Sequence, residues 1–130
     1  MTSLTGKTAL VTGASKGIGL AVSHRFAEAG ADLIMLSEAD DIHAAATEVE
    51  SRWSRPVEAL VCDISDREAV KREIGKINHL DVLINNAAIE IFVPILDPDP
   101  SVEEDFLRII SVNLLGDFRV KVEVKPRQNL

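Results

Sequence analysis

The feature that most constrains the fold is a regular alternation of two hydrophobic patterns along the chain. Short apolar runs predict buried strands at 8–11, 33–36, 57–62 and 80–84. After each run the apolar residues recur at the spacing of one helix face, which predicts a helix behind every strand. Parallel neighbours need such crossover connections, and strands covered on both faces are apolar throughout. The sequence therefore predicts an α/β domain with a parallel sheet.

Capping signals locate the starts of the last three predicted helices. Asp40 or Asp41 can cap the second helix, which Pro56 then ends. The segments 65–68 and 101–104 both read Ser-x-x-Glu and predict capping boxes. A long loop before the last helix contains three prolines: Pro94, Pro98 and Pro100.

The last twelve residues depart from this pattern. From Phe118 to Lys125 apolar and charged residues alternate, which is typical of a strand with one face in water. Residues 119–130 have a net charge of +3, whereas residues 1–118 have a net charge of −10. We therefore predict a domain over 1–118, followed by an atypical basic tail over 119–130 that forms an edge strand or a loose end.

Composition excludes several classes of protein. A length of 130 residues fits one domain, and a net charge of −7 argues against a nucleic-acid binder. The single cysteine excludes an intrachain disulfide, and no metal-ligand spacing is present. We see neither a targeting signal nor the run of ~18 apolar residues that a membrane span needs. These observations predict a cytoplasmic protein that binds no nucleic acid, membrane or metal.

A glycine-rich loop joins the first predicted strand to the first helix. Gly13, Gly17 and Gly19 permit positive φ and a close approach of the backbone to a ligand. The helix that follows offers free N–H groups and the positive end of its dipole. The same glycines could form only a tight turn, but their place after the first strand of an alternating chain favours a diphosphate site.

The spacing Gly-x-x-x-Gly-x-Gly and three later motifs are similar to those of the short-chain dehydrogenase/reductase family. These motifs are Asp63-Ile64 after the third strand, Asn85-Asn86-Ala87-Ala88 after the fourth, and 112–116 in the last helix. The resemblance covers residues 4 to about 118 and includes Thr12 before the glycine loop. It implies a Rossmann-like doubly wound parallel sheet, here incomplete, with four strands in the order 3-2-1-4.

The resemblance also implies roles for the motif residues. The glycines would form the diphosphate turn, Ser15 and Lys16 would face the adenosine ribose, and Asp63 would flank the adenine with Ile64. The predicted cofactor-binding residues are Gly13, Ser15, Lys16, Gly17, Ile18, Gly19, Ser37, Asp63, Ile64, Asn86, Ala87 and Ala88. Ala88 stands where the family usually has glycine, a departure that would crowd the site slightly.

Some of these residues also have a purely structural explanation. Asp63 could cap a turn beside Ser65, and Asn86 could close the fourth strand. Asn113 is a poor helix former, so a kink or a packed hydrogen bond must account for it in mid-helix. The resemblance implies that Asn113 holds a kinked helix and a water in the family's proton relay, which makes it the predicted catalytic residue.

The choice of nicotinamide cofactor depends on charge at the end of the second strand. The family's discriminating position falls on Ser37, which carries no charge to repel a 2′-phosphate. Lys16 adds a cation in the glycine loop, whereas Glu38 would oppose a phosphate. We therefore predict that NADP(H) is favoured over NAD(H).

The chain contains no tyrosine. Complete family members transfer a hydride between NADP(H) or NAD(H) and a carbonyl or alcohol, using a serine and a Tyr-x-x-x-Lys motif. We therefore expect a cofactor-binding half, truncated before the catalytic tyrosine and lysine and inactive by itself. One alternative is a non-catalytic nucleotide-binding or regulatory module that pairs with another subunit. In a further alternative, a partner chain supplies the catalytic groups.

The remaining reactive side chains receive structural interpretations. We expect Cys62 to be a small buried hydrophobe, Trp53 to pack a helix end and the histidines to lie at the surface. The fourth strand would expose one edge unless the tail covers it. The last helix is apolar on more than one face, which predicts self-association or marginal stability.

Overall fold

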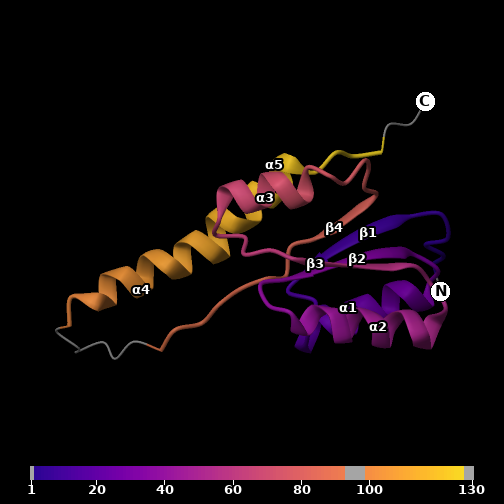
Figure 1. Cartoon of the computed structure of the whole chain (residues 1–130), viewed down its shortest axis with the longest axis horizontal. Coiled ribbons are helices and arrows are strands. Elements are labelled where there is room, and N and C mark those ends of the chain that lie inside the picture. Colours follow the sequence, from indigo (N-terminus) through magenta and orange to yellow (C-terminus); the bar gives the residue numbers. More distant parts are fainter. Residues whose placement is uncertain (1, 93–98, 128–130) are drawn as a thin grey trace.

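A computed structural model describes residues 2–92 and 99–127, so Pro94 and Pro98 of the predicted loop lie outside the described residues. The elements, in chain order, are β1 (Thr8–Thr12), α1 (Gly17–Glu28), β2 (Asp32–Ser37), α2 (Asp41–Trp53), β3 (Val57–Val61), α3 (Arg67–Ile74), β4 (Val82–Ile84), α4 (Ser101–Ile110), the π-helix η1 (Ser111–Gly116) and α5 (Asp117–Glu123). The strands are parallel and lie in the order β3-β2-β1-β4 (Figure 1). The predicted α/β class, Rossmann-like sheet and strand order are confirmed.

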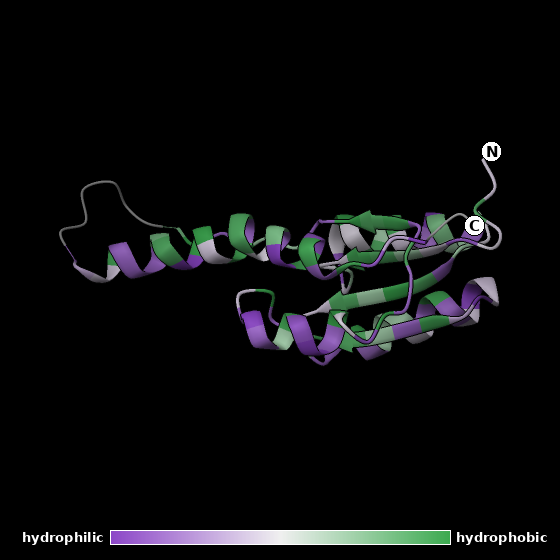
Figure 2. Ribbon diagram, turned by 90° about the horizontal axis from the view of Figure 1, so that it is seen from above, coloured by the Kyte–Doolittle hydropathy of each residue, from purple (hydrophilic) through white to green (hydrophobic). Residues whose placement is uncertain are grey.

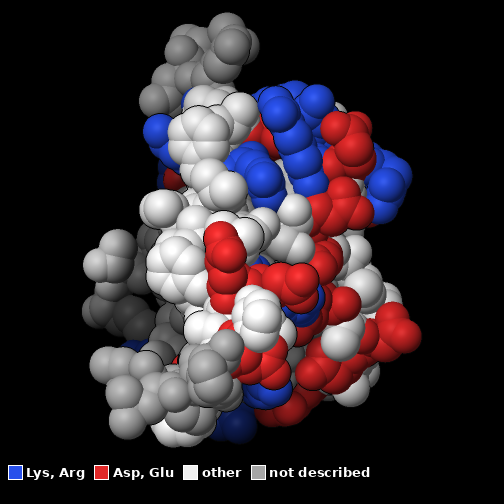
Figure 3. All heavy atoms as spheres, turned by 90° about the vertical axis from the view of Figure 1, so that its left-hand side faces the viewer, with Lys and Arg blue, Asp and Glu red and all other residues white. Residues whose placement is uncertain are grey.

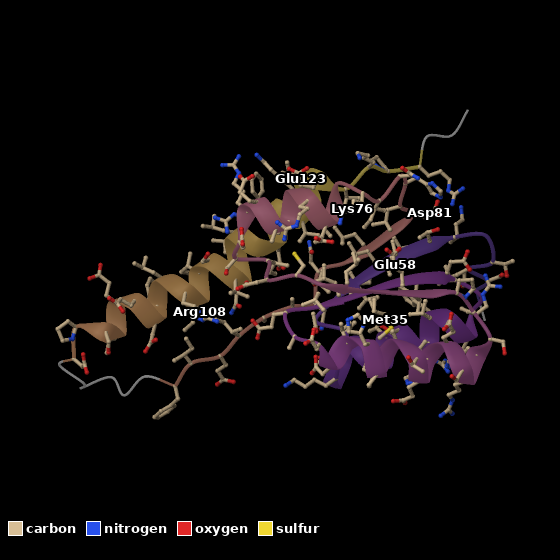
Figure 4. The ribbon with its side chains drawn as sticks, in the orientation of Figure 1. Met35, Glu58, Lys76, Asp81, Arg108 and Glu123 are labelled. Atoms are coloured by element: carbon tan, nitrogen blue, oxygen red, sulfur yellow. The ribbon has the colours of Figure 1, made fainter. Side chains whose placement is uncertain are left out.

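Helices cover both faces of the sheet, and the strand residues alternate between them. On one face α1 and α2 pack over a cluster that includes Val11, Leu33 and Met35 (Figures 1 and 4). On the other face α3 and α5 pack over a cluster that includes Leu10 and Leu36. Because both faces are covered, β1 and β2 are apolar throughout and almost completely buried.

The last three helical elements form one long helix that extends well beyond the sheet (Figures 1 and 2). No residue of α4 is buried, although apolar side chains occur along it. Its Phe106 and Leu107 are more than half exposed, as is Leu114 of η1. The apolar faces of the predicted last helix therefore lack cover among the described residues.

Both predicted capping boxes are wrong in detail. The N-cap of α3 is Asp66, whose carboxylate accepts hydrogen bonds from the N–H groups of Glu68 (3.0 Å) and Ala69 (3.1 Å). Ser65 lies one residue before this N-cap, in a turn where its hydroxyl donates to Asp63 at 2.7 Å. In α4 the boundary also shifts by one residue, since Pro100 occupies the N-cap position and Ser101 is already helical.

The predicted edge strand at the end of the chain is also wrong over Asp117–Glu123, which is helical. Val120 faces α3 and is completely buried, whereas Phe118 and Val122 point outward. After this helix the chain is extended and meets the outer side of Leu80, through Leu80 N–H to Lys125 O (2.9 Å) and Arg127 N–H to Leu80 O (3.0 Å). The tail therefore covers the edge of the sheet only just before β4, which is itself shorter than the predicted strand.

Candidate nucleotide-binding site

A cavity of about 250 Å³ opens where the four parallel strands end. Four loops contribute to it, one from the carboxyl end of each strand, as expected for a ligand site in an open α/β sheet. The lining residues are Gly13, Ser15, Lys16, Leu36, Ser37, Glu38, Cys62, Asp63, Ile64, Asn86, Ala87, Ala88, Ile89 and Val112. The cavity thus brings together residues from all the predicted motifs. Gly17, Ile18 and Gly19 belong to the adjoining first turn of α1 and not to the lining.

The three loop glycines are required for two different reasons. Gly13 and Gly17 have φ values of +63° and +59°, a region that side chains disfavour. A Cβ on Gly13 would lie 2.9 Å from the Cα of Ala87, and one on Gly19 would collide with the carbonyl oxygen of Gly13. Gly17 has open space around it, so only its backbone conformation demands glycine. The loop is therefore packed directly against the segment that follows β4.

The amino-terminal end of α1 faces this loop without a capping side chain. Its N-cap residue is Lys16, which makes no side-chain capping bond, and the first turn contains no acidic residue. Free N–H groups and the positive end of a helix dipole favour an anion at such a position. Ile18 of this turn is exposed.

Thr12 connects the glycine loop to the loop after β4. Its hydroxyl oxygen accepts hydrogen bonds from the N–H groups of Asn86 and Ala87, each at 3.0 Å. The Asn86 side-chain amide donates to the carbonyl oxygens of Thr12 and Gly13, each at 3.2 Å. The sequence placed Thr12 in a motif but assigned it no role. The position of Thr12 at the end of the first strand, directly before the glycine loop, was the signal from which this connecting role could have been predicted.

Asn113 shows both features that were proposed to explain it. It lies within the π-helix η1, and its side chain pairs with the backbone of Ile89. The Ile89 N–H donates to Asn113 Oδ1 at 2.8 Å, while Asn113 Nδ2 donates to the Ile89 carbonyl at 2.9 Å. Its neighbour Val112 lines the cavity, whereas Asn113 itself does not. In this structure Asn113 therefore positions the segment after β4.

The end of β2 carries both favourable and unfavourable groups for a phosphate. The buried Ser37 hydroxyl contacts the Ala39 carbonyl (3.0 Å) and the Asp41 carboxylate (3.2 Å). Glu38 also lines the cavity. On the glycine loop, Lys16 is exposed and makes no ion pair with any residue that the structure describes.

At the end of β3, Asp63 caps a turn beside Ser65, which is the structural alternative that the sequence offered for this residue. Its carboxylate accepts from the Ser65 N–H at 2.9 Å as well as from the hydroxyl, and the residue still lines the cavity. Cys62 is buried, as predicted, but it also lines the cavity, which sequence reasoning missed. Burial, followed by the nearby Glu73 carboxylate, raises the pKa of the Cys62 thiol to about 11.

Two histidines, His24 and His79, contact side chains outside the cavity, and neither lines it. His24 Nδ1 accepts from Trp53 Nε1 at 3.0 Å, and its Nε2 lies 3.1 Å from Glu48, which links α1 to α2. His79 contacts Arg127. Within residues 2–92 and 99–127, no three His, Cys, Asp or Glu side chains cluster as metal ligands. None of the helices described is both long and apolar enough to cross a bilayer.

Comparison with known proteins gives a consistent result. A family model described as short chain dehydrogenase matches residues 7–128. The oxidoreductase UcpA of Escherichia coli K12 is 38% identical over 97% of this chain, which covers 48% of that relative. This chain thus spans about half the length of the curated relatives it matches.

Solved structures resemble the same part of the fold. The crystal structure of NAD+-bound xylitol dehydrogenase superposes with a TM-score of 0.84 and 31% identity, over 93% of this chain and 47% of that one. L-sorbose reductase from Gluconobacter frateurii, complexed with NADPH and L-sorbose, has a TM-score of 0.83 at 24% identity, over 94% and 47% of the two chains. At this lower identity the likeness concerns the fold alone.

Proposed function

Because the chain belongs to the short-chain dehydrogenase family, we propose that the cavity at the strand ends binds a nicotinamide dinucleotide. The observation that supports this most directly is the contact between the glycine loop and the loop after β4, which leaves no room for a Cβ at Gly13 or Gly19. Gly17, between these two glycines, has open space where a Cβ would stand, which would admit a diphosphate close to the backbone, and the uncapped end of α1 would attract its charge. The dinucleotide, when bound, supplies the hydride chemistry; these residues bind and orient it.

We assign the parts of the dinucleotide to the motif residues as follows. Gly13, Gly17 and Gly19, with Ile18, hold the diphosphate, and Ser15 and Lys16 face the adenosine ribose. Asp63 and Ile64 flank the adenine, and Asn86, Ala87 and Ala88 form the floor beneath the nicotinamide side. Asn113 acts through Ile89, because its two hydrogen bonds fix the backbone of that cavity-lining residue.

We propose that this site binds NADP(H) in preference to NAD(H). Ser37 is uncharged, and Lys16 offers a cation that no described acidic residue neutralises. Asp41 and Glu38 oppose this preference, so the balance depends on Lys16. Lys16→Gln should weaken NADPH binding about tenfold and leave NADH binding within about twofold, because one charge-assisted bond to a phosphate is lost. Equal losses for both cofactors would contradict the preference.

In this proposal, residues 1–118 form the dinucleotide-binding part and 119–130 a basic tail, of which Lys125 and Arg127 contact Leu80 just before β4. The 130 residues contain no tyrosine to exchange a proton with a carbonyl substrate, so we expect binding of cofactor without turnover. The oxidoreductase activity then belongs to complete family members, acting on carbonyls or alcohols.

A second function, a nucleotide-binding module that pairs with another copy, is favoured by the exposed apolar side chains of the long helix. Phe106, Leu107 and Leu114 are all more than half exposed. Exposed apolar groups along a helix commonly form protein interfaces. We propose self-association through this helix.

The decisive experiment is a fluorescence titration of the chain with NADPH. Gly19→Ala should weaken binding at least about tenfold, because the added methyl collides with the Gly13 carbonyl and displaces the loop. Ala21→Ser, at an exposed position on the same helix, is the matched control and should bind like the parent. A folded parent that does not bind NADPH, or a Gly19→Ala variant that binds as tightly, would refute the proposal.

A further inference from the structure

A second cavity, of about 240 Å³, lies between α3 and α5 and shares no lining residue with the nucleotide cavity. Its walls are the first turn of α3 and one face of η1 and α5. We call it the α3–α5 groove. The proposed dinucleotide site makes no use of it.

One wall of the α3–α5 groove is apolar and exposed. Leu115, Phe118 and Val122 are 42%, 61% and 59% exposed, and their spacing of three and four residues places them on one helix face. Val70 of α3 lies at the bottom of the groove and is completely buried. Contiguous exposed apolar surface of this kind favours a ligand that covers it.

Two arginines line the same groove. The guanidinium of Arg67, at the first position of α3, makes no hydrogen bond or ion pair with the residues that the structure describes. Arg119 donates from Nη1 to the Ser65 carbonyl at 2.7 Å, which fixes its guanidinium in the groove while other N–H groups stay available. Guanidinium groups bind carboxylates through paired, charge-assisted hydrogen bonds.

Neither arginine pairs with a carboxylate among the residues that the structure describes, whereas some of their basic neighbours do. On α3, Lys71 pairs with Glu68. The only acidic residue in the lining is Glu123, one turn beyond Arg119 along α5. Figure 3 shows Lys and Arg side chains gathered in the upper part of the molecule, where α3 and α5 lie, although the chain as a whole is acidic.

We propose that the α3–α5 groove binds a small amphipathic carboxylate, such as a medium-chain acyl acid. Its carboxylate accepts hydrogen bonds from Arg67 and Arg119, and its tail covers Leu115, Phe118 and Val122. A purely apolar occupant would cover Arg67 without a partner, and an inorganic anion would leave the apolar wall in water. The volume lies below the ~300 Å³ at which drug-sized pockets begin, which suits a short tail.

Octanoate is the probe, and its titration is followed in amide NMR spectra of the full chain. We expect saturable shifts at the amides around Arg67, Leu115 and Arg119, with few changes at the glycine loop. Octanol, which keeps the tail and lacks the charge, should bind about tenfold more weakly. Equal affinity for octanol, or no saturable shift in these amides, would overturn the proposal.

Variants separate the two halves of the groove. Arg67→Gln and Arg119→Gln should each weaken octanoate binding about five- to tenfold, while Lys121→Gln, which removes a charge of α5 outside the lining, should leave it unchanged. Phe118→Ser should weaken octanoate and octanol alike. A loss in Lys121→Gln as large as in Arg67→Gln would overturn the proposal.

Two controls separate this site from the other proposals. NADPH titration of the same variants should be unchanged, so failure of the groove and failure of the nucleotide site are distinguishable. Sedimentation at each octanoate concentration reports whether the chain changes its association state. Shifts that appear only when a dimer dissociates would show that a second copy, and not the carboxylate, occupies the groove, which overturns the proposal.

Discussion

The Thr12 hydroxyl bonds to two N–H groups that lie more than 70 residues away along the chain. Thr12→Val keeps the shape of this buried side chain but leaves the N–H groups of Asn86 and Ala87 without their acceptor. We expect the free energy of unfolding to fall by about 1–3 kcal/mol, because these partly buried donors lose their acceptor and are only incompletely hydrated without it.

Urea denaturation measures this change, with Thr47→Val as the matched control. Thr47 is exposed and its hydroxyl donates only to the His43 carbonyl within α2, so its loss should be within about 0.5 kcal/mol. If the two valine variants lost the same stability, Thr12 would not be the connection we describe.

A second residue-scale prediction concerns Cys62, whose pKa is raised to about 11 by burial. Because the thiolate is the reactive form, reaction with an aromatic disulfide should be slow at neutral pH and rise about tenfold per pH unit until about pH 11. The measurement is the rate of thionitrobenzoate release between about pH 7 and 10 in the folded chain. A rate that levels off below about pH 9 would contradict the raised pKa.

At the scale of single elements, the start of α3 tests which residue caps it. Asp66→Ala should lower the free energy of unfolding by about 1 kcal/mol, because two N–H groups of the first turn lose their acceptor. Ser101→Ala should change it by less than about 0.5 kcal/mol, since Pro100 and not Ser101 is the N-cap of α4, and the side-chain bond that Ser101 makes to Asp99 is at an exposed site. Thermal unfolding of both variants gives the comparison, and a larger loss in Ser101→Ala would restore the original capping-box prediction.

The caps also show what sequence patterns omit. Both Ser-x-x-Glu segments were recognised as helix starts, and helices do begin there. The pattern could not reveal that Asp63, two residues earlier, binds the Ser65 hydroxyl in a turn and that Asp66 is the cap. That arrangement is set by the turn geometry after β3 and not by residue type.

The junction between β4 and the tail should be sensitive to acid. Asp81 accepts hydrogen bonds from Arg127 Nε (2.8 Å) and from the Thr8 N–H (2.8 Å), and these interactions lower its pKa below the ordinary value of 3.8. Because the folded-state pKa is lowered, the stabilisation is complete above the ordinary value and is lost as pH falls through the folded-state pKa.

Asp81→Asn should therefore lower stability at neutral pH and flatten the fall in stability below about pH 4. Urea denaturation at a series of pH values measures both effects. Asp40→Asn, at an exposed position beside α2, is the control and should keep the parent's acid profile. A parent-like acid profile in Asp81→Asn would show that another group governs this range.

At the scale of the whole molecule, the sheet could be predicted because each strand is a separate apolar run and each crossover has a helical pattern. The helix at the end of the chain could not be predicted. Phe118, Val120 and Val122 alternate with charged residues, a pattern typical of a strand with one face in water. Only the tertiary fold decides between a strand and a helix here. Val120 packs against α3 and is completely buried, while Phe118 and Val122 are exposed. The cavity followed from the motifs, but its Cys62 and Ile89 walls depend on loop paths that carry no motif.

The long helix also has an uneven charge distribution that bears on its proposed self-association. Its first half contains Glu103, Glu104 and Asp105 against Arg108, whereas its last turns contain Arg119 and Lys121 balanced by Asp117 and Glu123, so the first half is acidic and the last turns are neutral. Two copies packed parallel would place the two acidic halves beside each other, whereas two copies packed antiparallel would place each acidic half beside the neutral last turns of the other, with the exposed apolar side chains between them. The charge pattern therefore favours an antiparallel pair.

The double variant Glu103→Lys with Glu104→Lys should weaken this association about tenfold at low salt, because Arg119 and Lys121 of the other copy then face two cations in place of two carboxylates, and salt should reduce the difference. Leu114→Glu should weaken it at every salt concentration, since a carboxylate would replace an apolar contact. Glu50→Lys, an exposed charge reversal on α2, is the control and should associate like the parent. Sedimentation equilibrium measures all four proteins. If the parent is monomeric at every attainable concentration, or if Glu50→Lys weakens association as much as the double variant, the helix is not the contact and its apolar side chains serve another interaction.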